Sequence, residues 1–399
     1  MPPDDLFAED RRRRLALGLQ RSLRDVDGPQ DTHVVIDRRR VLSLCSNNYL
    51  GLANHPAVVE AAVGAARVYG IGSGASRLIS GSMRIHHELE ERLAAFKCAE
   101  ASLLFTSGYQ ANLGAITSLV GVGDAVFSDA LNHASLIDGC RLSRADVHVF
   151  PHADVEGLEA RLRTVRARRR LIVTDSVFSM DGDAAPLREI CDLAQRYDAM
   201  VMVDEAHATG VVGERGAGLV EALGLEQRVS VQMGTLGKAL GAFGAFIAGS
   251  QGLIDLLVNR ARTFIFTTAL PPPVVAAAAA ALTIVAREPE RRAAVRRNAE
   301  RLRRGLRALG YEVRGDDSSH IVPVIVGDAA ATMALSAALL EEGVFAHGIR
   351  PPTVADGTAR IRATVMATHS PADIDAAVAA FASCARWASP GRRTPQRAR

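Results

Sequence analysis

The sequence predicts an α/β protein with a mostly parallel, doubly wound sheet, followed by a smaller C-terminal α+β domain. Two observations support this prediction. Short apolar and β-branched runs alternate with helical patterns across roughly residues 99–248, which is typical of a sheet built from strand–helix units. Several of these runs stop at polar or glycine-rich residues, and open α/β sheets bind their ligands at such strand ends. We therefore expect a ligand site at the carboxyl ends of these strands.

Length and composition leave room for two domains. The chain has 399 residues, of which 48% are hydrophobic and 23% charged, enough for two separate cores. We expect an N-terminal helix and arm in residues 1–45, a large ligand-binding domain in 46–270 and a small domain in 271–388. Three prolines at 271–273 mark the expected hinge, and the polar, basic residues 389–399 are expected to be disordered.

Composition also limits the partners and the cellular compartment that we expect for this protein. A net charge of +3 is small for this length and gives little support for nucleic-acid binding. The alanine-rich run 274–286 is too short and too weakly apolar to cross a membrane. The five cysteines are scattered, without CxxC or matching histidine spacing, so we expect no zinc site and no disulfides, and a reducing compartment, the cytoplasm. Early acids such as Asp4 and Asp5 argue against a targeting segment.

The N-terminal segment predicts a helix and then strands. Residues up to about Gln30 have the pattern of one basic amphipathic helix, with the arginines of 11–14 on a solvated face and Arg21 nearer its end. Strands are expected from Val34 and from Leu42.

Two stretches that follow resemble other kinds of site. The glycine-rich segment 70–76 comes after a helix predicted for 55–69, whereas a dinucleotide fingerprint must follow a strand. It is therefore expected to be a loop near a ligand or a subunit interface, or a plain loop. The predicted helix 86–96 opens with several His and Glu residues, for which a polar helix face is favoured over a metal site.

The first strand–helix junctions of the expected sheet predict a phosphate site. Residues 102–106 read as a strand, and 107–112 open a helix whose free N–H groups and positive dipole end suit a phosphate. Gly108 would let that phosphate approach closely. The next strand, 125–128, is soon followed by His133, which is well placed to stack on a flat cofactor.

The later strands of the expected sheet end at the residues that best indicate the chemistry of the site. Strands are expected at 147–150 and 171–174, the second followed by a tight loop at 177–183. The buried run Val201–Val203 ends at Asp204, and a second apolar run, Val229–Met233, leads to a glycine-flanked lysine, Lys238. This spacing suggests two adjacent strand ends that share one site.

Pyridoxal phosphate (PLP) is the cofactor that needs these side chains together. Asp204 would keep the pyridine nitrogen protonated, His207 would touch the ring oxygen, and Lys238 would form the Schiff base. Thr235 would reach the phosphate. For any one of these residues alone, a solvated surface position is an equally good interpretation, but their joint placement on apolar strands favours a site.

A nucleotide-hydrolysing enzyme is the rival interpretation, and the spacing excludes it. Asp204–His207 also spells the Mg-binding box of some helicases, and Gly237 with Lys238 resembles the end of a P-loop. A P-loop needs Gly where this chain has Gln232 and Ser or Thr where it has Ala239. The acidic box also precedes the lysine, which inverts the usual order.

The C-terminal part predicts a small α+β unit. Its helical and strand patterns alternate less regularly than those of the large domain. The expected elements are a long helix to about Leu309, strands at 321–326, 344–349 and 359–366, and helices at 329–342 and 371–387.

Four segments resemble, in order and spacing, the motifs of the α-oxoamine synthases. They are Asn132–Leu136, Val177–Asp183, Asp204–Gly210 and Thr235–Lys238. The resemblance covers nearly the whole chain and implies a fold type I PLP-dependent transferase. The segment 349–362, with its double proline, is most similar to the branch that condenses L-alanine with a pimeloyl thioester, on coenzyme A or acyl carrier protein, in biotin biosynthesis.

The resemblance implies roles for the residues around the cofactor. Lys238 would carry the Schiff base, Asp204 would pair with the pyridine nitrogen, His207 would contact the ring oxygen and His133 would stack on the ring. The other cofactor contacts it implies are Gly108, Tyr109 and Thr235 at the phosphate and Ser179 near the ring oxygen.

The resemblance also implies a homodimer with shared active sites and a set of substrate contacts. Thr267 or Thr268 would reach the phosphate in the neighbouring subunit. Arg362, with Asn47 nearby, would bind the amino-acid carboxylate. The acyl substrate would contact Arg21 and Thr353, and Arg24 is an alternative to Arg21.

Other functions stay open at this point. Leu131–Gly139 also suits 2-amino-3-ketobutyrate CoA ligases, which use glycine and acetyl-CoA, and Ala355-Asp356 departs from the Pro-Ala more usual in the alanine-using branch. An aminotransferase is disfavoured by the His207 and His133 motifs. A non-catalytic synthase subunit is disfavoured by the presence of Lys238. Neither the acyl carrier nor a role for the basic tail follows from the sequence.

Overall fold

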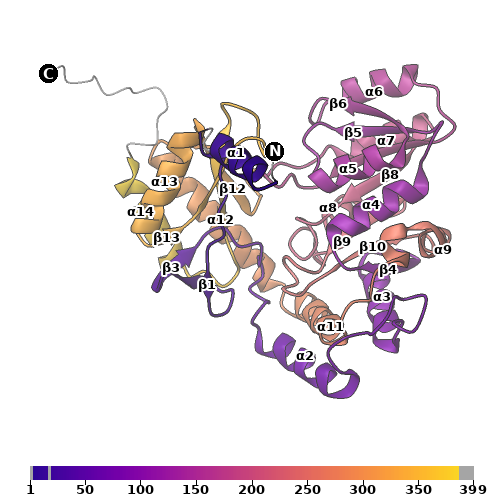
Figure 1. Ribbon diagram of the computed structural model, residues 1–399, viewed down its shortest axis with the longest axis horizontal. Coiled ribbons are helices and arrows are strands. Elements are labelled where there is room, and N and C mark those ends of the chain that lie inside the picture. The colour runs from indigo at the N-terminus through magenta and orange to yellow at the C-terminus, as the bar shows by residue number, and fades with distance from the viewer. Residues whose placement is uncertain (1–2, 17–18, 386–399) are drawn as a thin grey trace. The chain divides into compact units, whose positions relative to one another are not determined.

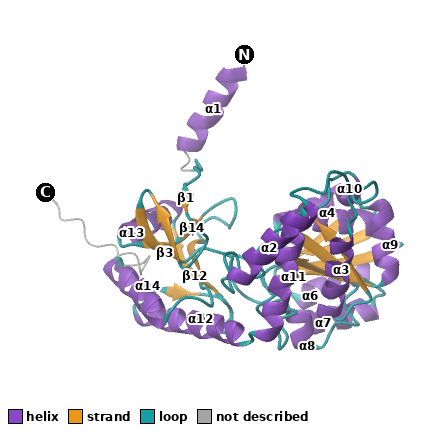
Figure 2. Ribbon diagram, turned by 90° about the horizontal axis from the view of Figure 1, so that it is seen from below, coloured by secondary structure: helices purple, strands orange, loops and turns teal. Residues whose placement is uncertain are grey.

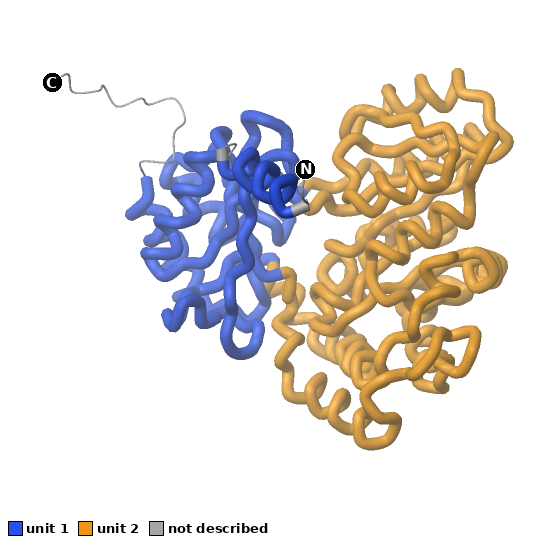
Figure 3. Tube along the Cα trace, in the orientation of Figure 1, with its two compact units in different colours: residues 1–46, 180–182, 296–399 blue, residues 47–179, 183–295 orange. Residues whose placement is uncertain are grey.

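The computed structural model describes residues 3–16 and 19–385 and divides into two compact units (Figures 1 and 3). Unit 2 contains Asn47–Ser179 and Asp183–Val295. Unit 1 contains Met180–Gly182 together with the described residues before Asn47 and after Val295. The predicted tail at 389–399 lies outside the described residues.

A seven-stranded sheet forms the centre of unit 2. Its strand order is β4-β10-β9-β8-β7-β5-β6, and every neighbouring pair from β9 to β6 is parallel, whereas β10 is antiparallel to both neighbours. The predicted mostly parallel α/β sheet is therefore confirmed. The strands are β4 (Ala101–Phe105), β5 (Ala125–Asp129), β6 (Asp146–Phe150), β7 (Arg170–Asp175), β8 (Met200–Asp204), β9 (Val231–Thr235) and β10 (Ala245–Gly249).

Alternate residues of these strands face two separate cores, as a doubly wound sheet requires. Val126 and Met202 belong to one core, and their neighbours Phe127 and Val203 belong to the other. Helices lie on both sides of the strands in Figure 2. The first core includes residues of α4 (Gly108–Leu119), α5 (Ala134–Ser143) and α9 (Gln251–Arg260), and the second includes residues of α6 (Val155–Thr164) and α7 (Leu187–Arg196).

Unit 1 is a smaller α+β assembly with two four-stranded sheets, ordered β1-β2-β3-β13 and β11-β12-β15-β14. The strands are β1 (Val26–Asp27), β2 (His33–Ile36), β3 (Arg39–Ser43), β11 (Glu312–Val313), β12 (Ile321–Gly327), β13 (Val344–Phe345), β14 (His347–Ile349) and β15 (Ala359–Thr364). The remaining helices of the structure are α1 (Pro3–Ala16), α2 (Pro56–Tyr69), α3 (Arg84–Phe96), α8 (Leu219–Leu223), α10 (Arg262–Ile265), α11 (Pro272–Arg287), α12 (Glu290–Ala308), α13 (Ala329–Glu341) and α14 (Pro371–Ser383).

The compact units differ from the predicted domain boundaries at two places. The N-terminal arm groups with the C-terminal segment, because β3 pairs in parallel with β13. The helix α11, expected to open the small domain after the three prolines, groups with unit 2 because it packs against α2.

Three predicted elements are corrected. The N-terminal helix α1 ends at Ala16 instead of near Gln30, and Leu23, within the predicted helix, is fully exposed. The predicted long helix to Leu309 is two helices, since Pro289 has no N–H to continue the first. The predicted strand 344–349 is two short strands, β13 and β14, which belong to different sheets.

No helix among the described residues is long and apolar enough to cross a membrane. All five cysteines are free thiols.

Candidate active site

Three neighbouring strands of unit 2 end side by side and carry the polar residues of the site. Asp175 at the end of β7 is paired with Asp204 at the end of β8, and Asp204 is paired with Met233 of β9. Lys238 follows shortly after β9 ends at Thr235. These strand ends border a cavity of about 170 Å³. It is lined by Gly108, Tyr109, Asn112, His133, Ser135, Asp175, Asp204, Ala206, His207, Met233, Thr235 and Lys238.

Asp204 is buried, and its carboxylate is held by two donors. Oδ1 accepts the backbone N–H of Ala206 at 2.8 Å, and Oδ2 accepts Nδ2 of Asn112 at 2.7 Å. Asn112 projects from α4 and is itself fully buried, with a second bond from Nδ2 to Ser135 Oγ at 2.8 Å. These bonds fix the carboxylate in one orientation toward the cavity.

His207 connects Lys238 to Tyr49. Nζ of Lys238 lies 2.8 Å from Nε2 of His207, and Nδ1 of His207 lies 2.7 Å from the hydroxyl of Tyr49. Tyr49 donates its hydroxyl proton to Oδ1 of Asn47 at 2.9 Å. The pattern is satisfied when Nδ1 of His207 carries the proton and Nε2 accepts from Lys238, a tautomer assigned from this network.

His133 caps the N-terminus of α5 and lies in the same cavity. Its backbone N–H donates to Asp175 Oδ2 at 2.7 Å, and its Nδ1 lies 2.7 Å from Ser135 Oγ. Burial lowers the pKa of His133, and the Lys238 ammonium lowers it further, while the Asp204 carboxylate opposes both. A neutral imidazole with an apolar face follows, which suits stacking on a flat ring.

Asp175 is the second carboxyl group of the cavity. Burial raises its pKa well above the ordinary value, and the nearby Asp204 carboxylate raises it further. Asp175 therefore favours the neutral form at this position.

The start of α4 offers the phosphate site that the sequence predicts. Ser107 caps this helix, because its Oγ accepts the N–H of Gln110 at 3.2 Å. The N–H groups of Gly108 and Tyr109 precede that bond at the positive end of the helix dipole. Thr235 lies across the cavity, where its Oγ1 donates to the carbonyl of Gly244 at 3.1 Å.

This set of side chains fits PLP. It combines a buried carboxylate for a protonated ring nitrogen, a neutral imidazole face, a primary amine and a helix N-terminus. In addition, Oδ1 of Asn112 is buried in the cavity wall and has no hydrogen-bond partner among the described residues, so the wall offers an unused acceptor.

Several predicted site residues do not line this cavity. Ser179 lies just before the tip of the loop after β7, whose base is closed by a bridge between Val177 and Ala184. Thr267 and Thr268 border a separate small cavity. Thr268 pairs with Ser76 of the glycine-rich loop, so the structure joins the two segments that were expected to reach a neighbouring subunit.

The predicted acyl contacts lie together in unit 1. Arg21 and Thr353 line one cavity of about 350 Å³, and Arg24 lines it as well. Arg362 lies on β15, directly opposite His347 of β14 in the antiparallel register, and only 7% of Arg362 is exposed. Asn47 belongs to unit 2 and accepts the proton of Tyr49.

The sequence-based interpretation missed Tyr49, Asn112, Ser135 and Asp175. Ser135 stands inside a motif already recognised, and Asp175 directly follows a predicted strand, so both had a usable signal. Asn112 lies one helical turn after Gly108, which is a weaker signal. Nothing near Tyr49 in the sequence indicates its bond to His207.

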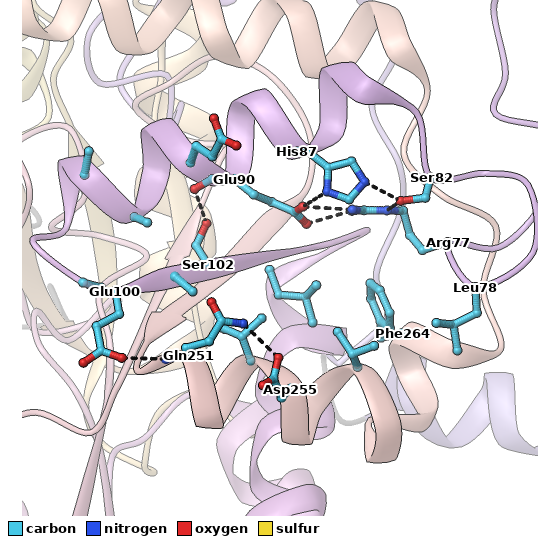
Figure 4. A pocket seen from close by; sticks show the side chains of 18 residues that line it. Arg77, Leu78, Ser82, His87, Glu90, Glu100, Ser102, Gln251, Asp255 and Phe264 are labelled. Carbon is cyan, nitrogen blue, oxygen red and sulfur yellow. Dashed lines mark hydrogen bonds and ion pairs between the residues drawn. The ribbon is translucent and has the colours of Figure 1, made fainter.

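His87 and Glu90, near the start of α3, have structural partners (Figure 4). Glu90 forms a bidentate ion pair with Arg77, with N–O distances of 2.7 and 2.8 Å. Its carboxylate also accepts the N–H of Leu104 at the edge of the sheet. Nε2 of His86 lies 2.8 Å from the carbonyl of Leu270. Within the described residues no group of three or more His, Cys, Asp or Glu side chains is arranged to hold a metal ion.

Comparison with known proteins defines the class. The family model of aminotransferase class I and II matches residues 39–381, so the chain belongs to this family of transferases. A solved structure of serine palmitoyltransferase from S. paucimobilis with bound PLP-myriocin matches with a TM-score of 0.91 at 34% identity, covering 96% of this chain and 97% of that one. The predicted fold type I architecture is thereby confirmed.

Sequence relatives narrow the class further. The chain is 52% identical over 384 residues to the 8-amino-7-oxononanoate synthase of Geotalea daltonii, covering 95% of this chain and 98% of that protein. It is 55% identical over 368 residues to the enzyme of that name from Anaeromyxobacter dehalogenans, covering 92% of each. The solved 8-amino-7-oxononanoate synthase of Francisella tularensis matches at 25% identity, with a TM-score of 0.76, and covers 87% of this chain and 98% of that one. The resemblance to the α-oxoamine synthases, and to this branch of them, is confirmed.

Proposed function

We propose that the protein is a PLP-dependent acyltransferase that condenses L-alanine with a pimeloyl thioester, on coenzyme A or acyl carrier protein. The products are 8-amino-7-oxononanoate, carbon dioxide and the free thiol, in biotin biosynthesis. One observation carries the proposal: Asp204, His207 and Lys238 meet in one cavity, in a chain that is more than half identical to synthases of that name. The five free thiols support a reducing compartment, which we take to be the cytoplasm.

PLP is proposed as the cofactor because the residues present fit it. When bound, it supplies a carbonyl that combines with amines and a ring that draws electrons from the amino-acid α-carbon. Asp204 would hold the proton of the ring nitrogen, with Asn112 keeping the carboxylate in place. The N-terminus of α4 and Thr235 would hold the phosphate.

Lys238 is proposed to bind the cofactor and to move the α-proton. Its amine lies beside Nε2 of His207, which accepts one of its protons and so keeps the amine aimed in one direction. An amine freed by an incoming amino acid can take the α-proton when it lies within hydrogen-bonding reach of that carbon. The neutral ring of His133 would cover the reacting face and exclude water.

Unit 1 is proposed to bind the substrates. A guanidinium such as Arg362 binds a carboxylate through two parallel hydrogen bonds, which suits the carboxylate of alanine. Arg21 and Thr353 share a cavity that also contains the apolar side chains of Leu23 and Met333. A cationic group beside apolar surface suits the distal carboxylate and methylene chain of a pimeloyl group.

We also propose a homodimer with shared active sites. Large apolar side chains lie exposed on and near the glycine-rich loop, with Ile71 75% and Ile79 80% exposed, and Phe266 is 70% exposed next to Thr267. Clustered exposed apolar residues mark interaction surfaces. Ser76 and Thr268 pair with each other, away from the cavity of their own chain, which supports their donation to a partner.

The test is turnover with purified protein. L-alanine and pimeloyl-CoA should yield thiol and carbon dioxide in equal amounts, with the product identified by mass spectrometry. Borohydride should attach PLP permanently to Lys238, because only a lysine imine is reduced to a stable secondary amine. The Lys238→Ala variant should lose both the turnover and the PLP that borohydride attaches. Pyridoxamine phosphate formed without thiol release would replace the proposal with an aminotransferase, and a reduced adduct on another lysine would overturn the site.

A further inference from the structure

His152 connects the loop after β5 with the loop after β7 through residues of unit 2. It follows β6 by two residues, and its ring lies between two carboxylates: Nδ1 is 3.0 Å from Oδ1 of Asp129 and Nε2 is 2.7 Å from Oδ2 of Asp183. Asp129 ends β5 and begins the loop to His133. Asp183 lies on the loop after β7, the loop that contains Ser179.

We propose that His152 is a positioning residue for the candidate active site, because its ring joins Asp129 to Asp183 and so holds the His133 loop against the Ser179 loop. The inference rests on the proposed function, in which His133 and Ser179 contact the cofactor. His152 itself touches neither the cavity nor its lysine.

The bonds around the two carboxylates extend the connection into both loops. Asp129 Oδ1 also accepts the N–H of Leu131, and Oδ2 accepts the N–H of Ala153, both at 2.8 Å. On the other loop, the carbonyl of Asp183 accepts the N–H of Phe178 at 2.9 Å. The ring of Phe178 meets the His152 ring edge-on, 4.3 Å between centroids. Each of the two aspartates is therefore bonded to the backbone of its own loop, and the imidazole contacts both aspartates.

A second connection joins the same loops closer to the cavity. Asn132 accepts the N–H of Asp175 at 3.0 Å, and Asp175 accepts the N–H of His133 at 2.7 Å. This inner connection holds the base of each loop at the strand ends. The tip of the Ser179 loop is also held by Arg360, whose Nη1 donates to the carbonyl of Met180 at 3.1 Å and which pairs with Asp181. Loss of the His152 ring would therefore remove a link between the two loops beyond their bases, while this contact at the tip remains.

A positive charge on the His152 imidazole strengthens its hydrogen bonds to the two carboxylates. Hydrogen bonds to Asp129 and Asp183 raise the pKa of His152 to about 10, and burial only partly opposes them. The ring is thus a cation across the ordinary working range, and both N–H groups donate to carboxylates. Charge-assisted bonds of this kind are roughly twice as strong as neutral ones.

His148 provides a matched comparison. It lies on β6, close to His152 in the chain, and its ring stacks on Phe127 with 5.4 Å between centroids. Within the part of the chain that the structure describes, its buried Nε2 has no hydrogen-bond partner. His148 therefore has the same side chain in the same region without the connecting role.

The test uses His152→Ala and His148→Ala in the full chain. PLP affinity, followed by absorbance, should fall about ten- to hundred-fold in His152→Ala, because misplacement of a contact by about 1 Å can cost that much. Hydrogen exchange should speed up in residues 129–133 and 176–184 and not across the rest of the sheet. His148→Ala should show neither change.

Added imidazole decides between positioning and general loss of structure. It should restore PLP affinity in His152→Ala and not in His148→Ala. Since both acceptors are carboxylates, imidazolium is the form that replaces the ring, so more imidazole should be needed for the same rescue as pH rises above the pKa of free imidazole. Unchanged PLP affinity, or a loss that imidazole does not reverse and that accompanies faster exchange throughout unit 2, would overturn the proposal.

Asp183→Asn gives an independent measurement if His152→Ala does not fold. It keeps the size of the side chain and removes one of the two charges, so the exchange change should be smaller and confined to the same two loops. Exchange and PLP affinity are read without turnover. A wild-type protein that binds PLP but makes another oxoamine would therefore leave the role of His152 testable, whereas a wild-type protein that does not bind PLP would refute the proposed function.

Discussion

The amine of Lys238 lies 2.8 Å from Nε2 of His207, and the hydroxyl of Tyr49 fixes the opposite nitrogen of that ring. A histidine held at both nitrogens can neither rotate nor change its tautomer without breaking a bond. The orientation of the lysine amine is therefore set by a tyrosine far away in the chain. Tyr49 orients His207, and His207 orients Lys238. Substitutions at the three positions should therefore have different effects on activity and on PLP binding.

Tyr49→Phe should lower kcat about ten- to hundred-fold while PLP stays bound and reducible on Lys238. The phenyl ring fills the same space but no longer holds Nδ1 of His207, and loss of such an outer hydrogen bond commonly has an effect of this size. Steady-state kinetics together with borohydride labelling would check it. Tyr197→Phe is the matched control, because its hydroxyl donates to Glu159, a half-buried residue that does not line the cavity. Equal activity of the two variants would contradict the series arrangement.

The best-predicted residues of the site are those at strand ends. Asp204, His207 and Lys238 could be predicted because a buried parallel strand is a short apolar run, and the polar residue that ends it faces the ligand. His133 follows the same logic after β5, which lies two strands from β8 in the sheet. Local sequence suffices here because the strand itself delivers the side chain.

The missed residues are those that reach the site across the fold. Tyr49 lies in a turn, and its bond to His207 depends on how the chain returns past β8, which no local pattern reveals. Asn112 looks like an ordinary helix residue until α4 is packed on the sheet beneath it. The N-terminal helix was extended too far because charged residues at helical spacing continue past Ala16, while nothing in the described structure covers Leu23.

Lys97→Met should destabilise the apo protein by about 3–5 kcal/mol. Nζ of Lys97 donates to Oε2 of Glu205 at 2.6 Å, and both side chains have no exposed surface. Removal of the ammonium leaves a buried carboxylate without its partner, and such a loss costs about that much. Urea denaturation would measure it.

Arg196→Gln is the control for that measurement. Arg196 pairs with Glu159 at 2.6 Å, but its side chain is 62% exposed, so water and salt screen the pair. Its loss should cost less than about 1 kcal/mol. Comparable losses of stability in the two variants would mean that the buried Lys97–Glu205 pair contributes no more to stability than an exposed pair.

A mixture of two inactive variants should recover part of the activity. Lys238→Ala lacks the reactive amine, and a Thr267→Ala, Thr268→Ala double variant lacks the segment that we expect to reach the partner's phosphate. In a hybrid dimer, one site combines the intact lysine of one chain with the intact threonines of the other. Activity after mixing and refolding would be compared with each variant alone. A fully active monomer by light scattering would rule out shared sites.

The choice of substrate is the sharpest test of the branch to which the chain is assigned. We expect L-alanine with a pimeloyl thioester to turn over fastest when alanine, glycine and serine are crossed with pimeloyl, acetyl, succinyl and palmitoyl thioesters. One methyl group is worth only about 1–3 kcal/mol, so glycine should be a poorer substrate and not an excluded one.

The acyl chain should be selected more strongly than the amino acid, because a cationic group that binds the distal carboxylate disfavours a chain that lacks it. Arg21 and Arg24 line the same cavity, so Arg21→Ala and Arg24→Ala separate their roles. The variant that loses pimeloyl turnover while keeping a low rate with acetyl thioester identifies the carboxylate contact. Fastest wild-type turnover with glycine and acetyl thioester would instead indicate a 2-amino-3-ketobutyrate ligase, and with serine and palmitoyl thioester a serine palmitoyltransferase. In either case the Lys238–His207 pair would keep its role, since the amine acts on the amino acid before the acyl group is chosen.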